Sequence, residues 1–178
     1  MKELKGTKTE QNLWSAFSGE SMARNRYNYY AEKARQEGYE QIGGIFDLTA
    51  ANEKAHAELW LKQLDGIGTT EENLVAAAGG EKYEWSEMYK QFAQEAKEEG
   101  FDQLATLFEM VGAVEKEHEE RYNTLVENLK KGIVFKRDKI VIWICRYCGH
   151  IHIAEDAPQV CPVCRSPRSF FEIKQENY

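Results

Sequence analysis

Residues 104–129, LATLFEMVGAVEKEHEERYNTLVENL, decide the fold of this chain. Apolar side chains recur in this stretch at steps of four and three, the spacing of one face of an α-helix. The face is formed by Leu104, Phe108, Val111, Glu115, His118, Tyr122, Leu125 and Leu129. The pattern predicts a buried helical seam, yet Glu115 and His118 in the middle of it are polar.

The pattern occurs twice in the chain. Residues 27–56 match residues 89–118 at a shift of 62 positions. The matched pairs include Tyr27 and Tyr89, Ala31 and Ala93, Gly38 and Gly100, Gln41 and Gln103, Phe46 and Phe108, Glu53 and Glu115, and His56 and His118. The repeat keeps its rare polar residues together with its apolar ones, and predicts two related helical hairpins.

The surrounding region is predicted to be helical. Residues from about 10 to 130 include no proline and are rich in helix-forming Ala, Glu, Gln, Lys and Leu. With glycines as breaks, we expect four helices: Glu10–Glu37, Tyr39–Leu64, Glu81–Glu99 and Phe101–Lys130. The links after Glu37 and Glu99 are short, and the link from Leu64 to Glu81 is long. This connectivity is typical of a ferritin-like four-helix bundle.

Five glutamates would meet in the core of that bundle: Glu20, Glu53, Glu81, Glu84 and Glu115. Ionised carboxylates are almost never buried without partners, because desolvation costs several kcal/mol or more each. Two metal ions would resolve the conflict. The Glu-x-x-His spacing of Glu53 with His56 and of Glu115 with His118 places each pair on one helix face. Because carboxylates and imidazoles suit iron or manganese, we expect a di-iron carboxylate site rather than solvated glutamates beside core histidines.

One of these glutamates and three further residues have additional expected roles. Glu84 exceeds the minimal set of four glutamates and two histidines, and a spare ligand would let one metal change partners between redox states. Tyr27 and Tyr89 could hydrogen-bond the ligand carboxylates, or could be ordinary aromatic core residues. Arg24 could pair with a carboxylate or reach solvent at the edge of the bundle.

The chain changes character after Gly132. Ile140–Ile144 reads as a strand, and residues 169–173 read as a closing strand. Two Cys-x-x-Cys pairs lie between them: Cys145 with Cys148, and Cys161 with Cys164. Their spacing predicts a tetrahedral four-thiolate metal site, which would stabilise a domain too small to build much core. His150 and His152 are expected to be surface or packing residues, because four cysteines complete the site.

The metal at the cysteines is either zinc or iron on residue type alone. Zinc would be structural, whereas a single iron would carry electrons. A neighbouring di-iron bundle needs an electron supply, which favours iron. We therefore expect two domains, a bundle over residues 1–135 and a four-cysteine domain over residues 136–178, with three iron ions per chain.

The charge distribution excludes several other functions. Residues 136–178 hold 7 basic and 5 acidic side chains, whereas residues 1–135 hold 16 basic and 25 acidic ones. An acidic helical region argues against nucleic-acid binding. There is no apolar run long enough for a membrane span and no apolar segment after the N-terminal lysines. The sequence thus predicts a soluble, cytoplasmic protein.

The order of these parts resembles the rubrerythrin family over nearly the whole chain. The matching segments are residues 19–29, 53–56, 80–89 and 115–118 and both cysteine pairs. Arg165 departs from the glycine that usually follows the last cysteine of free-standing rubredoxins, which affects the expected loop geometry and redox potential.

The resemblance implies specific roles for the ligands. Glu53 and Glu115 would bridge the two irons. Glu20 and Glu84 would complete one iron, and Glu81 and His118 the other. His56 would replace Glu84 on reduction.

The resemblance also implies an activity. It is the reduction of hydrogen peroxide to water, in protection against oxidative stress. Electrons would come ultimately from NAD(P)H through a separate rubredoxin or reductase, and the chain would form a homodimer or larger homo-oligomer. Alternatives are a ferroxidase that uses oxygen, a zinc-ribbon adaptor on a helical scaffold, and an oxygen or iron sensor. The linker over residues 132–139 would let the four-cysteine domain serve its own bundle or a partner's.

Overall fold

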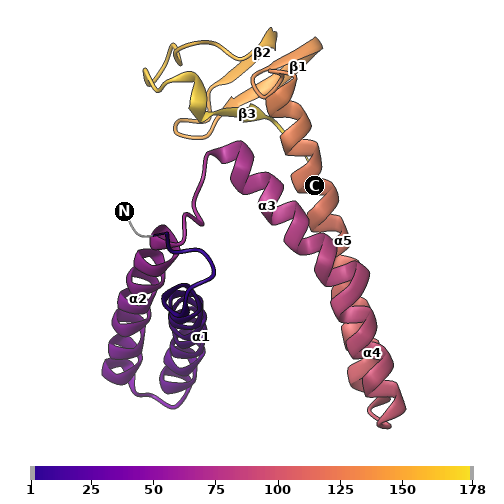
Figure 1. The fold of residues 1–178 in the computed structure, drawn as a ribbon. Helices are drawn as coiled ribbons and strands as arrows, with labels where there is room; N and C mark the ends of the chain where they lie inside the picture. The colour runs from indigo at the N-terminus through magenta and orange to yellow at the C-terminus, as the bar shows by residue number, and fades with distance from the viewer. Residues whose placement is uncertain (1–2, 177–178) are drawn as a thin grey trace. The chain divides into compact units, whose positions relative to one another are not determined.

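The computed structural model describes residues 3–176, which form two helical hairpins and a small sheet domain (Figure 1). The chain divides into two compact units, Met1–Thr69 and Thr70–Tyr178. The first unit holds one hairpin, and the second holds the other hairpin and the sheet. No helix in the described part of the chain is both long enough and apolar enough to cross a membrane.

The first hairpin consists of α1 (Lys8–Gln36) and α2 (Glu40–Gln63), which lie side by side (Figure 1). The hydroxyl of Thr7 accepts a hydrogen bond from the Glu10 backbone N–H and caps α1. The turn to α2 passes through Gly38, whose φ of +86° is in the left-handed region that glycine adopts at low cost. The helices approach closely at Gly43, where a Cβ would lie 3.1 Å from the Ala31 carbonyl oxygen.

The second hairpin has an interrupted first arm. This arm comprises α3 (Thr70–Tyr83), the π-helical turn η1 (Glu84–Met88) and α4 (Tyr89–Glu98), and it packs along α5 (Asp102–Lys130) (Figure 1). The prediction of a helix start at Glu81 is wrong by eleven residues, because Gly79 and Gly80 lie inside α3 rather than in a loop. Isolated glycines cost a helix only about 1 kcal/mol each, which neighbouring packing offsets.

The two hairpins contain the same aromatic cluster. In the first, Tyr27, Tyr30 and Phe46 have ring centroids 5.6–6.3 Å apart. In the second, Tyr89, Phe92 and Phe108 have ring centroids 5.6–6.4 Å apart. The sequence repeat is thus also a repeat of side-chain packing.

The predicted seam of α5 is not uniformly buried. Leu104 and Leu125 are 49% and 42% exposed, which corrects the prediction for these two positions. Further large apolar side chains are exposed on α2 and α5: Ile42, Ile45, Leu48, Leu107, Met110 and Val114. The physical reason is that, within a hairpin, each helix covers only one stripe of the other.

The C-terminal domain is a three-stranded antiparallel sheet. Its strands are β1 (Lys136–Cys145), β2 (Ile151–Asp156) and β3 (Phe171–Ile173), in the order β2-β1-β3, and the short helix η2 (Arg168–Phe170) precedes β3. The sequence analysis missed β2, although Ile151 and Ile153 alternate with polar residues as in a strand. The core contains Trp143, Cys145, Ala157, Cys161 and Phe171. Trp143 fixes the sheet because its indole N–H donates to the Ala154 carbonyl at 3.1 Å.

The predicted fold class is confirmed: the chain is mainly helical and ends in a small four-cysteine domain. The predicted domain boundary at residues 135 and 136 stays a prediction. β1 begins at Lys136, and it follows a turn that closes α5 through Gly132.

Candidate metal centres

The first hairpin brings three predicted ligands together. A carboxylate oxygen of Glu20, one of Glu53 and a ring nitrogen of His56 all lie within 4.8 Å of one another. His56 Nδ1 is 2.9 Å from Glu53 Oε2, as the i, i+3 spacing on α2 requires. The Glu53 side chain is only 17% exposed. A metal ion would find two carboxylates and an imidazole already in place here.

The second hairpin brings together an equivalent set. Ligand atoms of Glu81, Glu115 and His118 also lie within 4.8 Å of one another. His118 Nδ1 is 2.7 Å from Glu115 Oε2 and 3.9 Å from Glu81 Oε1. The Glu115 side chain is 14% exposed, close to the value for Glu53. The two Glu-x-x-His pairs therefore have the same geometry in both hairpins.

The electrostatics of the second cluster favour a bound cation. Desolvation and the nearby charge of Glu115 raise the pKa of Glu81. The pKa of Tyr89 is raised by desolvation and by the charges of Glu84 and Glu115. Crowded carboxylates that repel one another and stand partly out of water are the donor set that hard metal ions bind well. The residues present therefore fit the iron that this kind of site holds.

Glu84 lies outside both three-residue clusters. It is the first residue of η1, where the Tyr89 N–H donates to the Glu84 carbonyl five residues back. Such π turns are rare and occur frequently at functional sites. Its charge nevertheless acts on Glu81 and Tyr89, which places it beside the second cluster.

The remaining predicted residues have definite places. Tyr27 and Tyr89 are half-buried members of the aromatic clusters of their own hairpins. Arg24 is exposed on α1 and contacts Asn25, which confirms the solvent-facing alternative.

The sequence analysis did not single out Trp85 and Glu119. In the structure, the Trp85 indole N–H donates to a Glu119 carboxylate oxygen across the second hairpin at 2.6 Å. A signal was present in the sequence: Glu20 precedes Tyr27 by 7 residues, but Glu81 precedes Tyr89 by 8.

The four cysteines form one compact site. Their sulfur atoms all lie within 4.8 Å of one another, with Cys145 Sγ 3.7 Å from Cys164 Sγ and Cys148 Sγ 3.7 Å from Cys161 Sγ. A tetrahedron with metal–sulfur bonds of about 2.3 Å has edges of about 3.8 Å, so the spacing suits a metal. A disulfide would need about 2.05 Å. The cysteines are positioned as metal ligands and not as bridges.

Two similar turns hold these cysteines. Gly149 N–H donates to the Cys145 carbonyl at 2.8 Å, and Arg165 N–H donates to the Cys161 carbonyl at 3.0 Å. Both turn residues have positive φ, +76° for Gly149 and +64° for Arg165. Hydrogen bonds from the Ser166 hydroxyl and backbone lower the pKa of Cys164 to about 6. That thiol is therefore ready to bind a cation at neutral pH.

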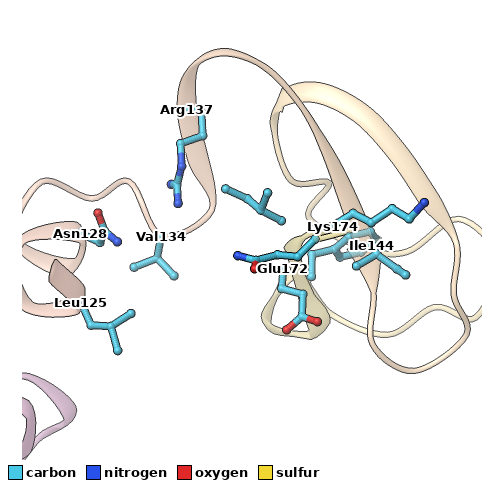
Figure 2. Close-up of a pocket in the computed structure, with 10 residues that line it drawn as sticks. Leu125, Asn128, Val134, Arg137, Ile144, Glu172 and Lys174 are labelled. Carbon is cyan, nitrogen blue, oxygen red and sulfur yellow. The ribbon is translucent and has the colours of Figure 1, made fainter. Parts of the chain in front are cut away.

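A separate hollow of about 700 Å³ lies beside the edge strand of the sheet (Figure 2). Its lining includes Leu125 and Asn128 of α5, Arg137 of β1, and Glu172 and Lys174 around β3. The lining carries none of the predicted metal ligands, so the metal chemistry belongs to the clusters described above.

Two carboxylate–histidine clusters on a pair of helical hairpins, followed by a four-cysteine sheet domain, define the class of ferritin-like di-iron proteins with a rubredoxin-like domain. The family model described as rubrerythrin matches residues 11–126, and the model of the rubrerythrin rubredoxin-like domain matches residues 143–172. The chain belongs to the rubrerythrin family.

Individual relatives agree over the full length of the chain. Rubrerythrin-1 of Clostridium acetobutylicum is 46% identical, with 100% of each chain covered. The rubrerythrin of Porphyromonas gingivalis is 44% identical over 99% of this chain and 95% of its own. A solved structure of nigerythrin in a mixed-valence state covers 98% of this chain and 92% of its own at 31% identity, with a TM-score of 0.36. That score is too low to establish a common arrangement, so family membership rests on the sequences.

Proposed function

We propose that the protein is a peroxidase that reduces hydrogen peroxide to water, with electrons relayed through the four-cysteine iron. The supporting observation is that one chain carries two carboxylate–histidine clusters and one four-thiolate cluster. When bound, a pair of irons would supply the two electrons that one peroxide molecule takes up, and an iron held by the four thiolates would return electrons one at a time. The relatives of this family are generally proteins of oxidative-stress defence.

The seven bundle ligands divide into shared and separate ones under this proposal. Glu53 and Glu115 would bridge the two irons; they occupy matching places in the repeat, and their side chains are only 17% and 14% exposed. Glu20 and Glu84 would complete one iron, and Glu81 with His118 the other. His56, with its half-exposed imidazole, would take the place of Glu84 on reduction. The ligands of both clusters would then serve a single di-iron centre.

The tyrosines and aromatic rings of the two hairpins provide hydrogen bonds and limit the access of water. The Tyr89 phenol, whose pKa is raised by desolvation and by the charge of Glu84, is protonated at neutral pH and can donate a hydrogen bond toward the second cluster. Tyr27 holds the equivalent place in the first hairpin. Half-buried aromatic rings around these two phenols restrict water, which strengthens the electrostatic interactions of the site. Developing negative charge on the peroxide oxygens is thereby stabilised beside bound cations.

Electrons are proposed to enter at the accessible sulfur atoms of the four-cysteine site. Cys145 and Cys161 are buried, whereas Cys148 is exposed and Cys164 half-buried. Cys148, the exposed cysteine, would present the centre to a donor protein, a rubredoxin or a reductase that draws ultimately on NAD(P)H. The proposal places the protein in the cytoplasm as a homodimer or larger homo-oligomer, with the four-cysteine domain serving its own bundle or a partner's.

The test separates the two kinds of centre. In Cys161→Ser, anaerobically reduced protein should complete one peroxide turnover at the parent rate, while re-reduction by the donor slows at least tenfold. Arg165→Gly, which keeps all four cysteines, is the matched control. It should complete both the peroxide turnover and the re-reduction by the donor. Loss of the single turnover in Cys161→Ser, with iron still bound in the bundle, would show that this division of labour is wrong.

A further inference from the structure

The second hairpin contains one residue more than the first between its predicted ligand glutamate and its tyrosine. Tyr27 follows Glu20 by seven positions and Tyr89 follows Glu81 by eight, although Tyr27 and Tyr89 occupy matching positions of the repeat. The structure accommodates the additional residue in η1, Glu84–Met88. Inserting one residue into an α-helix rotates what precedes it by about 100° unless a wide turn absorbs it. The π turn absorbs it, and the additional carboxylate Glu84 opens that turn.

Trp85, the next residue, ties this turn to the opposite helix. Its indole N–H donates to Glu119 Oε2 of α5 at 2.6 Å, a short bond to a charged acceptor. Glu119 lies one residue beyond the ligand His118. The bond therefore joins the residue after Glu84 to the residue after His118, and fixes the two segments relative to each other.

Two cations lie over the same indole ring. Lys90 Nζ is 5.3 Å and Lys116 Nζ 5.8 Å from the ring centroid. Beside the ring is a groove of about 250 Å³, which Trp85, Tyr89, Phe108 and Gly112 help to line. Because this side of the ring is not filled, packing leaves the indole room to move, and the hydrogen bond to Glu119 restrains it.

The first hairpin, over its described helices Lys8–Gln36 and Glu40–Gln63, lacks these features. Trp85 lies four residues before Tyr89, and the residue four positions before Tyr27 is Ala23. Trp85 also lies four residues after Glu81, and the residue four positions after Glu20 is Arg24. The place of Glu119 is taken by Ala57, which is buried at 7% exposure. The helix α1 is α-helical throughout its described length. The tryptophan, its acceptor and the additional carboxylate therefore occur together in one hairpin and are replaced together in the other.

We propose that Trp85 and Glu119 are positioning residues, whose hydrogen bond holds the π turn so that Glu84 reaches one metal and makes the two metal positions unequal. This inference rests on the proposed function, in which Glu84 is an iron ligand. Breaking the bond frees the turn and removes Glu84 from its place, while the six other ligands keep theirs.

The test uses full-length protein titrated anaerobically with ferrous iron, with Mössbauer spectra of ⁵⁷Fe to resolve the bundle irons. Trp85→Phe, which keeps the ring but not the donor, and Glu119→Ala should each weaken one bundle iron at least tenfold and change its quadrupole splitting. Glu119→Gln keeps an acceptor oxygen and should restore parent behaviour. The double variant should be no worse than either single one, because both remove the same bond.

The first hairpin supplies the matched control. Asn28 Nδ2 donates to Asp47 Oδ1 at 3.2 Å, also between two helices, so Asn28→Ala breaks a comparable contact away from Glu84. It should leave both irons unchanged. Parent-like spectra in Trp85→Phe and Glu119→Ala, with a clear effect of Glu84→Ala, would overturn the positioning inference alone. No effect of Glu84→Ala on either iron would overturn the proposed ligand role, and the inference with it.

Discussion

The two helical hairpins are built alike but are chemically unequal. Each has one aromatic cluster and one Glu-x-x-His pair with His–Glu distances of 2.9 and 2.7 Å. Among the described helices, only the second hairpin has a π turn, and with it a third carboxylate and the Trp85–Glu119 bond. The difference teaches that one additional residue in a duplicated hairpin is enough to add a carboxylate that the other hairpin lacks.

The same comparison separates what is needed for folding from what is needed for chemistry. The aromatic clusters repeat with nearly the same geometry, as core packing requires when two hairpins share a common plan. The carboxylate set repeats except for Glu84, which has no counterpart in the first hairpin, and desolvation together with the charge of Glu115 raises the pKa of Glu81 in the second hairpin. Such repulsion opposes folding without metal and strengthens metal binding.

The largest expected effect tests whether the two clusters share one centre. Glu53→Ala and Glu115→Ala should each weaken both bundle irons by more than about 100-fold, because each proposed bridge touches both metals. The four-cysteine iron should stay bound. Iron content and the visible spectrum of the iron–thiolate centre measure this, and loss of one iron alone in either variant would mean that the clusters act separately.

A second pair of variants tests the equivalence of the aromatic clusters. Phe46→Ala and Phe108→Ala should each destabilise the metal-free protein by roughly 2–3 kcal/mol, below the cost in a full core because both rings are half-buried. Urea unfolding measures the two values, which should agree within about 1 kcal/mol. Phe92→Tyr, which copies Tyr30 of the first cluster, is the near-neutral control. A large difference between the two alanine variants would break the comparison.

A third pair of variants tests whether the two metal positions are unequal. Glu84→Ala should weaken one iron about tenfold or more and leave the other nearly unchanged, since only one metal is proposed to use this carboxylate. Met22→Ala changes the matching position, counted back from Tyr27, and should have no effect because Met22 is exposed and not a ligand. Ferrous-iron titration resolves the two affinities. Equal weakening of both irons by Glu84→Ala would contradict the asymmetric centre.

The smallest expected effect concerns the two cysteine turns, which form a similar comparison. Arg165 has a φ of +64°, a conformation that favours glycine. Arg165→Gly should therefore stabilise the metal-bound domain by about 0.5–1 kcal/mol, and Gly149→Ala should destabilise it by about 1 kcal/mol. Thermal unfolding measures both. Destabilisation by Arg165→Gly would show that the arginine side chain makes a contact that outweighs its backbone strain.

Much of this architecture could be predicted from the sequence, because spacing determines which side chains share a helix face. The positions of Glu53, His56, Glu115 and His118 followed from that rule. The continuation of α3 through Gly79 could not be predicted, since tertiary packing offsets the low helix propensity of glycine. The π turn was also missed, because a one-residue difference in spacing is clear only once the backbone shows where it is absorbed.

In the four-cysteine domain, too, some features could be predicted from the sequence and others could not. Its four ligands followed from the cysteine spacing. Strand β2 did not, because its short alternation lies next to the first cysteine pair, where a loop was expected. The low pKa of Cys164 depends on Ser166, two residues away, and on a turn that only the structure shows.

The most direct test of the account is to reduce the purified protein anaerobically, mix it rapidly with hydrogen peroxide or with oxygen, and follow the return of the ferric–thiolate colour. Electron flow from the four cysteines to the unequal di-iron centre predicts colour recovery that is faster with peroxide than with oxygen. Faster recovery with oxygen would contradict the peroxidase proposal and favour an oxidase or ferroxidase, and no colour in any state would mean that the cysteines hold zinc and relay no electrons.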